Sequence, residues 1–185
     1  MEIYLIRHTT PKVDKGLCYG QSDLELADTF SQELDAVLHK IPDDFDRVFS
    51  SPLHRCSKLA MHISADATID PRLMELDFGE WENKRWEDIE IPALNRWMDD
   101  FVHIPPPKGE SFIDLQNRVV PAWTMITKQK VEKIAIVTHA GVIRVILSEI
   151  LGFPLQNAFK IKLDYGKVSK IRISEGLCTL EYINV

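Results

Sequence analysis

The sequence contains few cysteines, no long apolar run and no excess of basic residues. Its three cysteines are Cys18, Cys56 and Cys178, and none belongs to a Cys-x-x-Cys pair or accompanies a histidine pair at zinc-site spacing. We therefore expect reduced thiols rather than disulfides or a zinc site. The first residues lack the basic start and the long apolar stretch of a signal peptide, so we expect a cytoplasmic protein with no membrane association.

The charge balance is acidic, with 22 basic and 28 acidic residues and a formal net charge of -6. This balance argues against a nucleic-acid backbone or an anionic membrane as the main partner, although it allows a local basic pocket for a small anion. The 185 residues show no internal repeat, low-complexity tract or linker. Length and composition therefore predict one ordinary globular domain.

Strand patterns recur along the whole chain. Short apolar runs predict buried strands at residues 2–6, 47–49 and 133–138. Residues 168–173 and 177–185 are separated by a turn signal and predict a closing hairpin.

Helical patterns lie between these strands. The predicted helices are residues 26–41, a helix capped by Ser51 with Pro52 at its first position, residues 86–102, residues 112–126 with a kink or a lost hydrogen bond at Pro121, and residues 140–151. The alternation predicts a single three-layer α/β domain over residues 1–185, with a mainly parallel sheet and helices on both faces. Residues 70–107 are irregular and rich in tryptophan and proline, so we expect a substrate-facing insertion there.

Three polar clusters fall at the carboxyl ends of the predicted strands: Arg7-His8, residues 51–55 and His139-Ala140-Gly141. In open α/β sheets those ends line the ligand crevice. Arginine side chains bind phosphate oxygens in a bidentate way, and backbone amides at the start of a helix add dipole stabilisation. With Glu75 from the following loop, the clusters indicate phosphoryl transfer.

Five motifs occur in a fixed order along the chain. They are Leu5-Ile6-Arg7-His8, Ser50-Ser51-Pro52-Leu53-His54-Arg55, Leu73-Met74-Glu75 with Phe78-Gly79-Glu80-Trp81-Glu82, Gly109-Glu110-Ser111, and Val137-Thr138-His139-Ala140-Gly141. Together they resemble the histidine phosphatase (phosphoglycerate mutase-like) superfamily from residue 3 to about residue 150.

The resemblance implies a role for each polar residue. His8 is the nucleophile that becomes phosphohistidine, Arg7, Arg55 and His139 hold the phosphoryl oxygens, and Glu75 is the proton donor. Elementary chemistry agrees, because a neutral imidazole can attack phosphorus while positive groups stabilise the equatorial oxygens. The resemblance implies a metal-independent phosphatase without a cofactor.

The sequence departs from the family pattern directly after the nucleophile, where Thr9, Thr10 and Pro11 replace the usual glycine, acidic or amide residue, and threonine or serine. Thr9 lacks the conformational freedom of glycine and brings a side chain close to the site. Its hydroxyl either donates to the phosphate or belongs to a tight turn without ligand contact.

Within the superfamily, residues 7–11 and 18–23 are most similar to the α-ribazole phosphatases of cobalamin nucleotide-loop assembly. This implies a small phosphorylated metabolite, an aromatic ribonucleoside 5'-phosphate, as the substrate of a monomer or homodimer. The alternatives are a phosphoglycerate mutase-type phosphotransferase and a non-catalytic phosphate-binding module. The candidate substrate-binding residues are Thr9, Tyr19, Gln21, Trp81, Lys108, Glu110 and Ala140.

Overall fold

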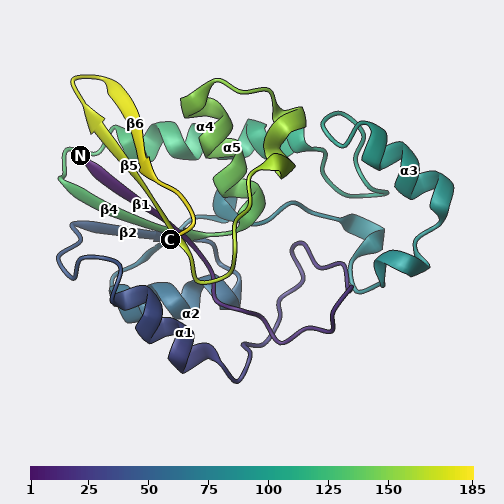
Figure 1. Ribbon diagram of the computed structural model, residues 1–185, viewed down its shortest axis with the longest axis horizontal. Helices are drawn as coiled ribbons and strands as arrows, with labels where there is room; N and C mark the ends of the chain where they lie inside the picture. The colour runs from purple at the N-terminus through teal and green to yellow at the C-terminus, as the bar shows by residue number, and fades with distance from the viewer.

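The computed structural model describes residues 1–185, and one six-stranded sheet forms its centre (Figure 1). The strands are β1 (Glu2–Arg7), β2 (Arg47–Ser50), β3 (Thr68–Ile69), β4 (Lys133–Thr138), β5 (Val168–Ser174) and β6 (Leu177–Tyr182). Their order across the sheet is β3-β2-β4-β1-β5-β6. Strands β1 to β4 are parallel, whereas β5 pairs antiparallel with both β1 and β6.

Helices cover both faces of this sheet, as Figure 1 shows. The helices are α1 (Phe30–Leu38), α2 (His54–Ile63), α3 (Ile91–Asp99), α4 (Phe112–Thr127) and α5 (Ala140–Leu151). Helices α1 and α2 lie on one face, α4 and α5 lie on the other, and α3 projects beyond the end of the sheet. The predicted three-layer α/β architecture is confirmed. No helix combines the length and apolar character that crossing a membrane requires.

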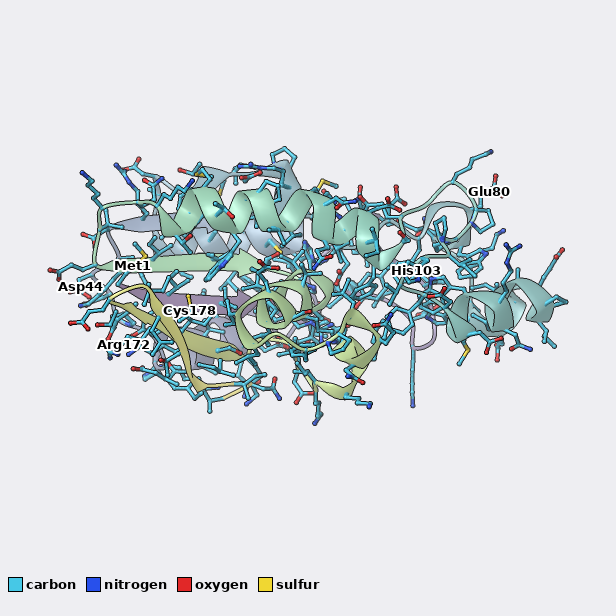
Figure 2. All side chains as sticks on the ribbon, turned by 90° about the horizontal axis from the view of Figure 1, so that it is seen from above. Met1, Asp44, Glu80, His103, Arg172 and Cys178 are labelled. Carbon is cyan, nitrogen blue, oxygen red and sulfur yellow. The ribbon has the colours of Figure 1, made fainter.

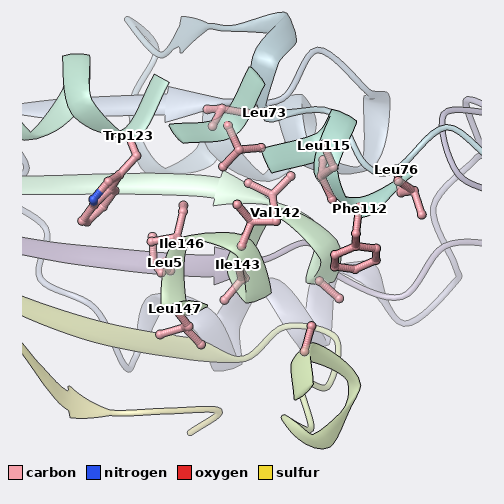
Figure 3. Close-up of a cluster of buried hydrophobic side chains, with 14 of the residues drawn as sticks. Leu5, Leu73, Leu76, Phe112, Leu115, Trp123, Val142, Ile143, Ile146 and Leu147 are labelled. Carbon is pink, nitrogen blue, oxygen red and sulfur yellow. The ribbon is translucent and has the colours of Figure 1, made fainter. Parts of the chain in front are cut away.

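Alternation along the strands divides the buried side chains into two clusters, because successive residues point to opposite faces of a sheet. Leu5 of β1 packs with Leu115 of α4 and Ile146 of α5 on one face (Figure 3). Its neighbour Ile6 belongs to the cluster on the other face, together with Leu59 of α2. Strand β1 is therefore covered on both sides, as its continuous apolar run predicts.

The start of α2 differs from the prediction. Leu53 is extended (φ -61°, ψ 136°) and the helix begins at His54 rather than at Pro52. Ser51 does not act as the helix cap: its Oγ lies 2.8 Å from His139 Nε2 and accepts a long, 3.4 Å hydrogen bond from the Leu53 amide. The capping prediction was wrong because the Ser51 hydroxyl faces the strand-end cluster instead.

The predicted helix over residues 86–102 is also wrong, because the segment divides into two elements. A one-turn 3₁₀ helix spans Trp86–Asp88, and α3 begins after the two non-helical residues Ile89 and Glu90. Pro92 lies in the first turn of α3, where a missing N–H leaves no intrahelical bond unmade. The division keeps the proline out of a helix interior.

Helix α4 continues through Pro121, which has no N–H to donate to the Asn117 carbonyl. Both residues are exposed, so solvent can reach that carbonyl and the lost bond costs less than it would in the core. The helix begins at a capping box in which Ser111 and Asp114 exchange hydrogen bonds between side chain and backbone.

The core on the α4 and α5 face supplies a direct test of the packing. Leu115 is fully buried, so we expect Leu115→Ala to lower the free energy of unfolding by about 2–5 kcal/mol in urea titrations. Met61 of α2 is 61% exposed, and Met61→Ala should change the same quantity by less than about 0.5 kcal/mol. Equal losses in the two variants would contradict the assignment of this core.

Candidate active site

The parallel register brings the polar clusters to one edge of the sheet. Arg7 at the end of β1 lies opposite Thr138 at the end of β4, and the His8 amide donates to the Thr138 carbonyl at 3.0 Å. The next residues along the two strands are therefore neighbours, and the His8 and His139 ring centroids lie 5.0 Å apart. Ser51, which follows β2, contacts His139 from the other side.

The His8 ring is almost fully buried, and its Nδ1 lies 2.7 Å from the Thr9 carbonyl oxygen. A carbonyl only accepts hydrogen bonds, so Nδ1 carries the hydrogen in this contact and Nε2 keeps its lone pair in the neutral ring. Burial lowers the pKa of His8 well below its ordinary value, and the charges of Arg55 and Arg7 lower it further. The geometry thus presents an uncharged imidazole with a free Nε2 electron pair.

Two guanidinium groups flank His8. Arg55 is fully buried and donates to the carbonyls of Gly20 at 2.7 Å and Ser22 at 2.8 Å. Arg7 donates to the Leu163 carbonyl, and its guanidinium carbon lies 3.8 Å from the centroid of the Tyr165 ring. In both arginines the Nε–H is buried without a hydrogen-bond partner, which leaves a donor for the oxygens of an anionic ligand.

His139 lies beside His8 at the same edge of the sheet. The ring is fully buried, with Nε2 at 2.8 Å from Ser51 Oγ and 3.4 Å from the Cys56 sulfur. Burial lowers its pKa well below the ordinary histidine value, and His8 and the two arginines act in the same direction. Both histidines are therefore neutral at physiological pH, and the fixed charges come from the arginines.

Glu75, from the loop that follows residues 71–73, lies against the start of α5. Its two carboxylate oxygens accept from the Gly141 amide at 3.1 and 3.2 Å, and Oε1 also accepts from the Leu76 amide at 2.9 Å. A Cβ at position 141 would lie 2.2 Å from Glu75 Oε1, so only glycine allows this approach. The glycine after His139-Ala140 thereby fixes the carboxyl group against the helix.

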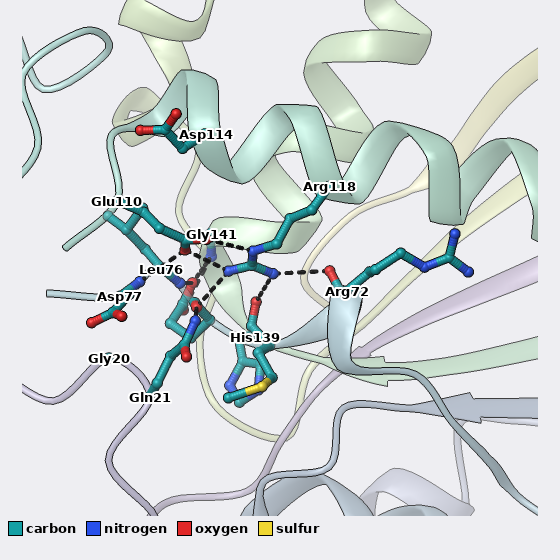
Figure 4. Close-up of polar contacts among 12 residues, drawn as sticks. Gly20, Gln21, Arg72, Leu76, Asp77, Glu110, Asp114, Arg118, His139 and Gly141 are labelled. Atoms are coloured by element: carbon teal, nitrogen blue, oxygen red, sulfur yellow. Dashed lines mark hydrogen bonds and ion pairs between the residues drawn. The ribbon is translucent and has the colours of Figure 1, made fainter. Parts of the chain in front are cut away.

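An arginine of α4 supports the loop that carries Glu75 (Figure 4). Arg118 donates to the backbone carbonyls of Arg72, Met74 and Glu75, at 2.7 to 2.9 Å. It also pairs with both carboxylate oxygens of Glu110, which in turn accepts from the Asp77 amide. Arg118 thus holds the loop before and at Glu75, and Glu110 holds it at Asp77, so the bidentate pair sets the position of Glu75.

Comparison with known proteins identifies this arrangement. The sequence pattern of the histidine phosphatase superfamily (branch 1) matches residues 3–185. The chain belongs to the histidine phosphatase superfamily.

Individual relatives within the superfamily cover almost the whole chain. The adenosylcobalamin/alpha-ribazole phosphatase of Escherichia coli (strain K12) is 29% identical over 100% of this chain and 96% of its own. The putative phosphoserine phosphatase 2 of Hydrogenobacter thermophilus is 28% identical over 98% of this chain and 94% of its own. The crystal structure of the alpha-ribazole phosphatase from Shigella flexneri superposes with a TM-score of 0.90 at 28% identity, over 100% and 96% of the two chains.

Four of the five residues that the resemblance selects, Arg7, His8, Arg55 and Glu75, line one cavity of about 170 Å³. The fifth, His139, is fully buried and does not line it. Tyr19 and Ala140 of the candidate substrate-binding residues also line it. Tyr19 is fixed there by a hydrogen bond between its hydroxyl and that of Tyr165. No group of three or more histidine, cysteine, aspartate or glutamate side chains is placed to hold a metal ion.

Other predicted substrate contacts do not reach the cavity. Gln21 donates from its side chain to the Glu75 carbonyl and from its backbone to Glu82, so it bonds within the loops. Thr9 is fully buried and its hydroxyl has no partner, but it does not line the cavity wall. Glu110 is occupied by Arg118.

Two more candidate substrate-binding residues, Trp81 and Lys108, also lie outside the cavity. Trp81 is 5% exposed and packs edge-on against Trp86 and Trp97, so it supports the cavity wall from behind. Lys108 is exposed and pairs with Glu80 at 2.6 Å, outside the cavity. Its positive φ of 58° belongs to a turn, a feature that residue type alone does not reveal.

Several cavity residues were not anticipated from the sequence. Arg144 lies four residues after Ala140 on α5, a spacing that places both side chains on one helix face and could have revealed it. Its guanidinium donates to the Ile161 carbonyl and stacks 5.0 Å from the Phe159 ring centroid. Phe159 comes from the 3₁₀ helix Leu155–Lys160 that follows α5, where no apolar periodicity marks it.

The two buried imidazoles make stability depend on pH. Their pKa values are lowered from 6.5, so below about pH 6.5 the unfolded chain binds protons that the native state does not. This stability contribution is complete above that pH and falls with decreasing pH, by up to about 1.4 kcal/mol per pH unit for each histidine.

Urea unfolding between about pH 7.5 and 5.5 in phosphate-free buffer measures this slope. We expect His8→Asn to flatten the slope by about 1.4 kcal/mol per pH unit, whereas the exposed control His39→Asn should leave it as in the wild type. Parallel stability curves for wild type and His8→Asn would show that the native imidazole titrates like an unfolded one.

Proposed function

We propose that this histidine phosphatase hydrolyses phosphomonoesters through a phosphohistidine at His8. The observation that carries the proposal is that one cavity presents the His8 ring, two arginines and the Glu75 carboxyl together. A phosphate-binding module needs the positive groups but has no use for a carboxyl group held against them, and this favours an enzyme over a non-catalytic binder.

The first step transfers the phosphoryl group to the enzyme. The His8 Nε2 lone pair attacks phosphorus, and the bond between phosphorus and the ester oxygen breaks. Arg7 and Arg55 stabilise the charge on the equatorial oxygens, and His139 stabilises it through a neutral N–H. Protonated Glu75 gives its proton to the departing oxygen, which leaves as the alcohol.

The second step releases phosphate. Glu75, now a carboxylate, accepts a proton from a water molecule whose oxygen attacks the phosphohistidine. The phosphorus–nitrogen bond breaks, its electron pair returns to His8 Nε2, and inorganic phosphate forms. The two arginines supply the positive charge throughout, so the proposed reaction requires no metal ion or other cofactor.

We further propose an aromatic ribonucleoside 5'-phosphate, α-ribazole 5'-phosphate, as the substrate, which places the enzyme in the assembly of the cobalamin nucleotide loop. Two observations support this choice. The cavity wall contains the aromatic residues Phe78, Trp86, Phe112 and Phe159, on which a benzimidazole ring can stack. Relatives that match over the full chain carry the name α-ribazole phosphatase.

Arg144 favours a second candidate substrate class. It is the one cavity cation besides the two phosphate-binding arginines, and a small acidic ester such as phosphoserine or phosphoglycerate would place its carboxylate near this group. A phosphoglycerate mutase-type transferase would use the same His8 and retain the phosphoryl group for return. The Arg144 guanidinium already bonds to the Ile161 carbonyl and stacks on Phe159, which leaves it less free for that purpose.

The proposed setting is the cytoplasm, supported by three free cysteines, two of which are buried. The state of assembly, monomer or homodimer, remains a prediction, as does the role of residues 70–107 as the substrate-facing part of one domain. Phe78 and Trp86 support that role, because both belong to this segment and line the cavity.

Glu75→Gln tests the proton donor. The amide preserves the shape of the carboxyl group but cannot donate a proton as an acid, so kcat for an alkyl phosphate should fall by about two to four orders of magnitude. The loss should be much smaller for 4-nitrophenyl phosphate, whose leaving group needs little protonation. Glu87→Gln, on the exposed surface, is the matched control. Equal losses with both substrates would remove Glu75 from the acid role.

A substrate panel tests the leaving group. We expect kcat/KM for α-ribazole 5'-phosphate to exceed the values for 5'-AMP, phosphoserine and 3-phosphoglycerate. Trp86→Leu should lower the α-ribazole value by about 5- to 150-fold, the worth of one stacked ring, and affect ethyl phosphate less. If the enzyme instead prefers phosphoserine or 3-phosphoglycerate, and Arg144→Met abolishes that preference, the substrate is a small acidic ester.

A further inference from the structure

An apolar groove of about 520 Å³ adjoins the active-site cavity on the side of α3. Every side chain that lines it is hydrophobic: Phe78, Trp86, Leu94, Trp97, Met98, Phe101 and Phe159. Phe78, Trp86 and Phe159 line the cavity as well, so they form a wall common to both. The groove is thus continuous with the place where the ester bond would break.

Helix α3 and the turn after it supply the far side of the groove. Leu94, Trp97, Met98 and Phe101 recur at the spacing of one helical face. Figures 1 and 2 show α3 standing away from the sheet and its covering helices, so this face packs against loops rather than against a second layer. Met98 remains 61% exposed and Phe159 48% exposed. A contiguous exposed apolar surface of this kind marks a binding site.

The cavity alone is too small to enclose a whole metabolite. Its volume of about 170 Å³ is smaller than the roughly 300–1,000 Å³ of sites that enclose a whole metabolite. The leaving alcohol must therefore continue past the cavity wall. A second hollow, which shares Leu17 and Tyr19 with the cavity, is bordered by the charged residues Asp14 and Lys15, whereas the groove beside Phe159 has no polar side chain.

We propose that this groove is a distal leaving-group subsite that binds the apolar part of the alcohol beyond its first ring or carbons. The inference rests on the proposed phosphatase function and specifies its substrate class: phosphomonoesters of elongated alcohols with an apolar far end. The phosphate lies against His8, the near part of the alcohol passes between Trp86 and Phe159, and the far end contacts Met98 and Phe101. Arg144, stacked on Phe159, marks the boundary between the charged cavity and the apolar groove.

A series of n-alkyl phosphates tests the subsite, because ethyl, hexyl and decyl phosphate have leaving alcohols of nearly equal acidity and differ in apolar length. We expect kcat/KM to rise by about threefold to fourfold for each methylene that enters the groove. This gain should come from a lower KM at a nearly constant kcat. All assays are performed below the concentration at which decyl phosphate self-associates.

Met98→Asp places a charge in the groove and should lower kcat/KM for decyl phosphate about tenfold more than for ethyl phosphate. Met61→Asp is the matched control, since Met61 of α2 has the same exposed fraction of 61% and lies outside the groove. It should preserve the chain-length dependence of the wild type.

Four outcomes would overturn the proposal. The subsite is absent if ethyl and decyl phosphate are hydrolysed with the same kcat/KM. It is also absent if Met98→Asp and Met61→Asp change the chain-length dependence of kcat/KM equally. In either case, turnover of ethyl phosphate still supports the phosphatase function. A dimer in sedimentation experiments that Met98→Asp dissociates would assign the groove to a second copy of the chain. If no phosphate ester is hydrolysed, the phosphatase function fails and the subsite falls with it.

Discussion

The parallel pairing of β1 with β4 decides where the chemistry of this molecule can occur. Their register places Arg7 opposite Thr138, so the residues that follow, His8 and His139, must lie side by side. Strand β2, paired to the other edge of β4, brings Ser51 and the start of α2 to the same place. Every other part of the site is arranged around this junction, with Glu75 held by the Gly141 amide in the first turn of the helix that follows His139.

This junction concentrates positive charge in a buried region. The Arg55 guanidinium is fully buried and bonds only to carbonyl groups, an arrangement that costs folding free energy because no carboxylate compensates it. Burial, and then the charges of the two arginines, lower the pKa values of His8 and His139, which keeps both rings neutral and His8 nucleophilic. A bound phosphate dianion would relieve this unfavourable positive charge. Arg118 does not line the cavity, and it holds Glu75 by donating to the Glu75 backbone carbonyl.

Sequence patterns anticipated the junction well, because it depends on short apolar strands followed at once by polar residues such as His8 and His139. They failed where position depends on tertiary contact. Ser51 has the sequence context of a helix cap, but its hydroxyl faces His139. Lys108 lies in a turn with a positive φ, and its side chain pairs with Glu80. Trp81 sits behind the wall that its neighbours Phe78 and Trp86 form, since a one-turn helix rotates it into the core. Much of the substrate side of the site comes from loops and short 3₁₀ helices, whose fold no local periodicity encodes.

The central claim is that the phosphoryl group is transferred to His8, and trapping the intermediate tests it most directly. Mixing the enzyme with phosphate-labelled substrate in the presence of a chelator and quenching within one turnover should yield a phosphoenzyme that is labile in acid and stable in alkali. Peptide mapping should place the label on His8, and His8→Ala should show neither label nor turnover. Label on another residue, or full turnover by His8→Ala, would contradict the account.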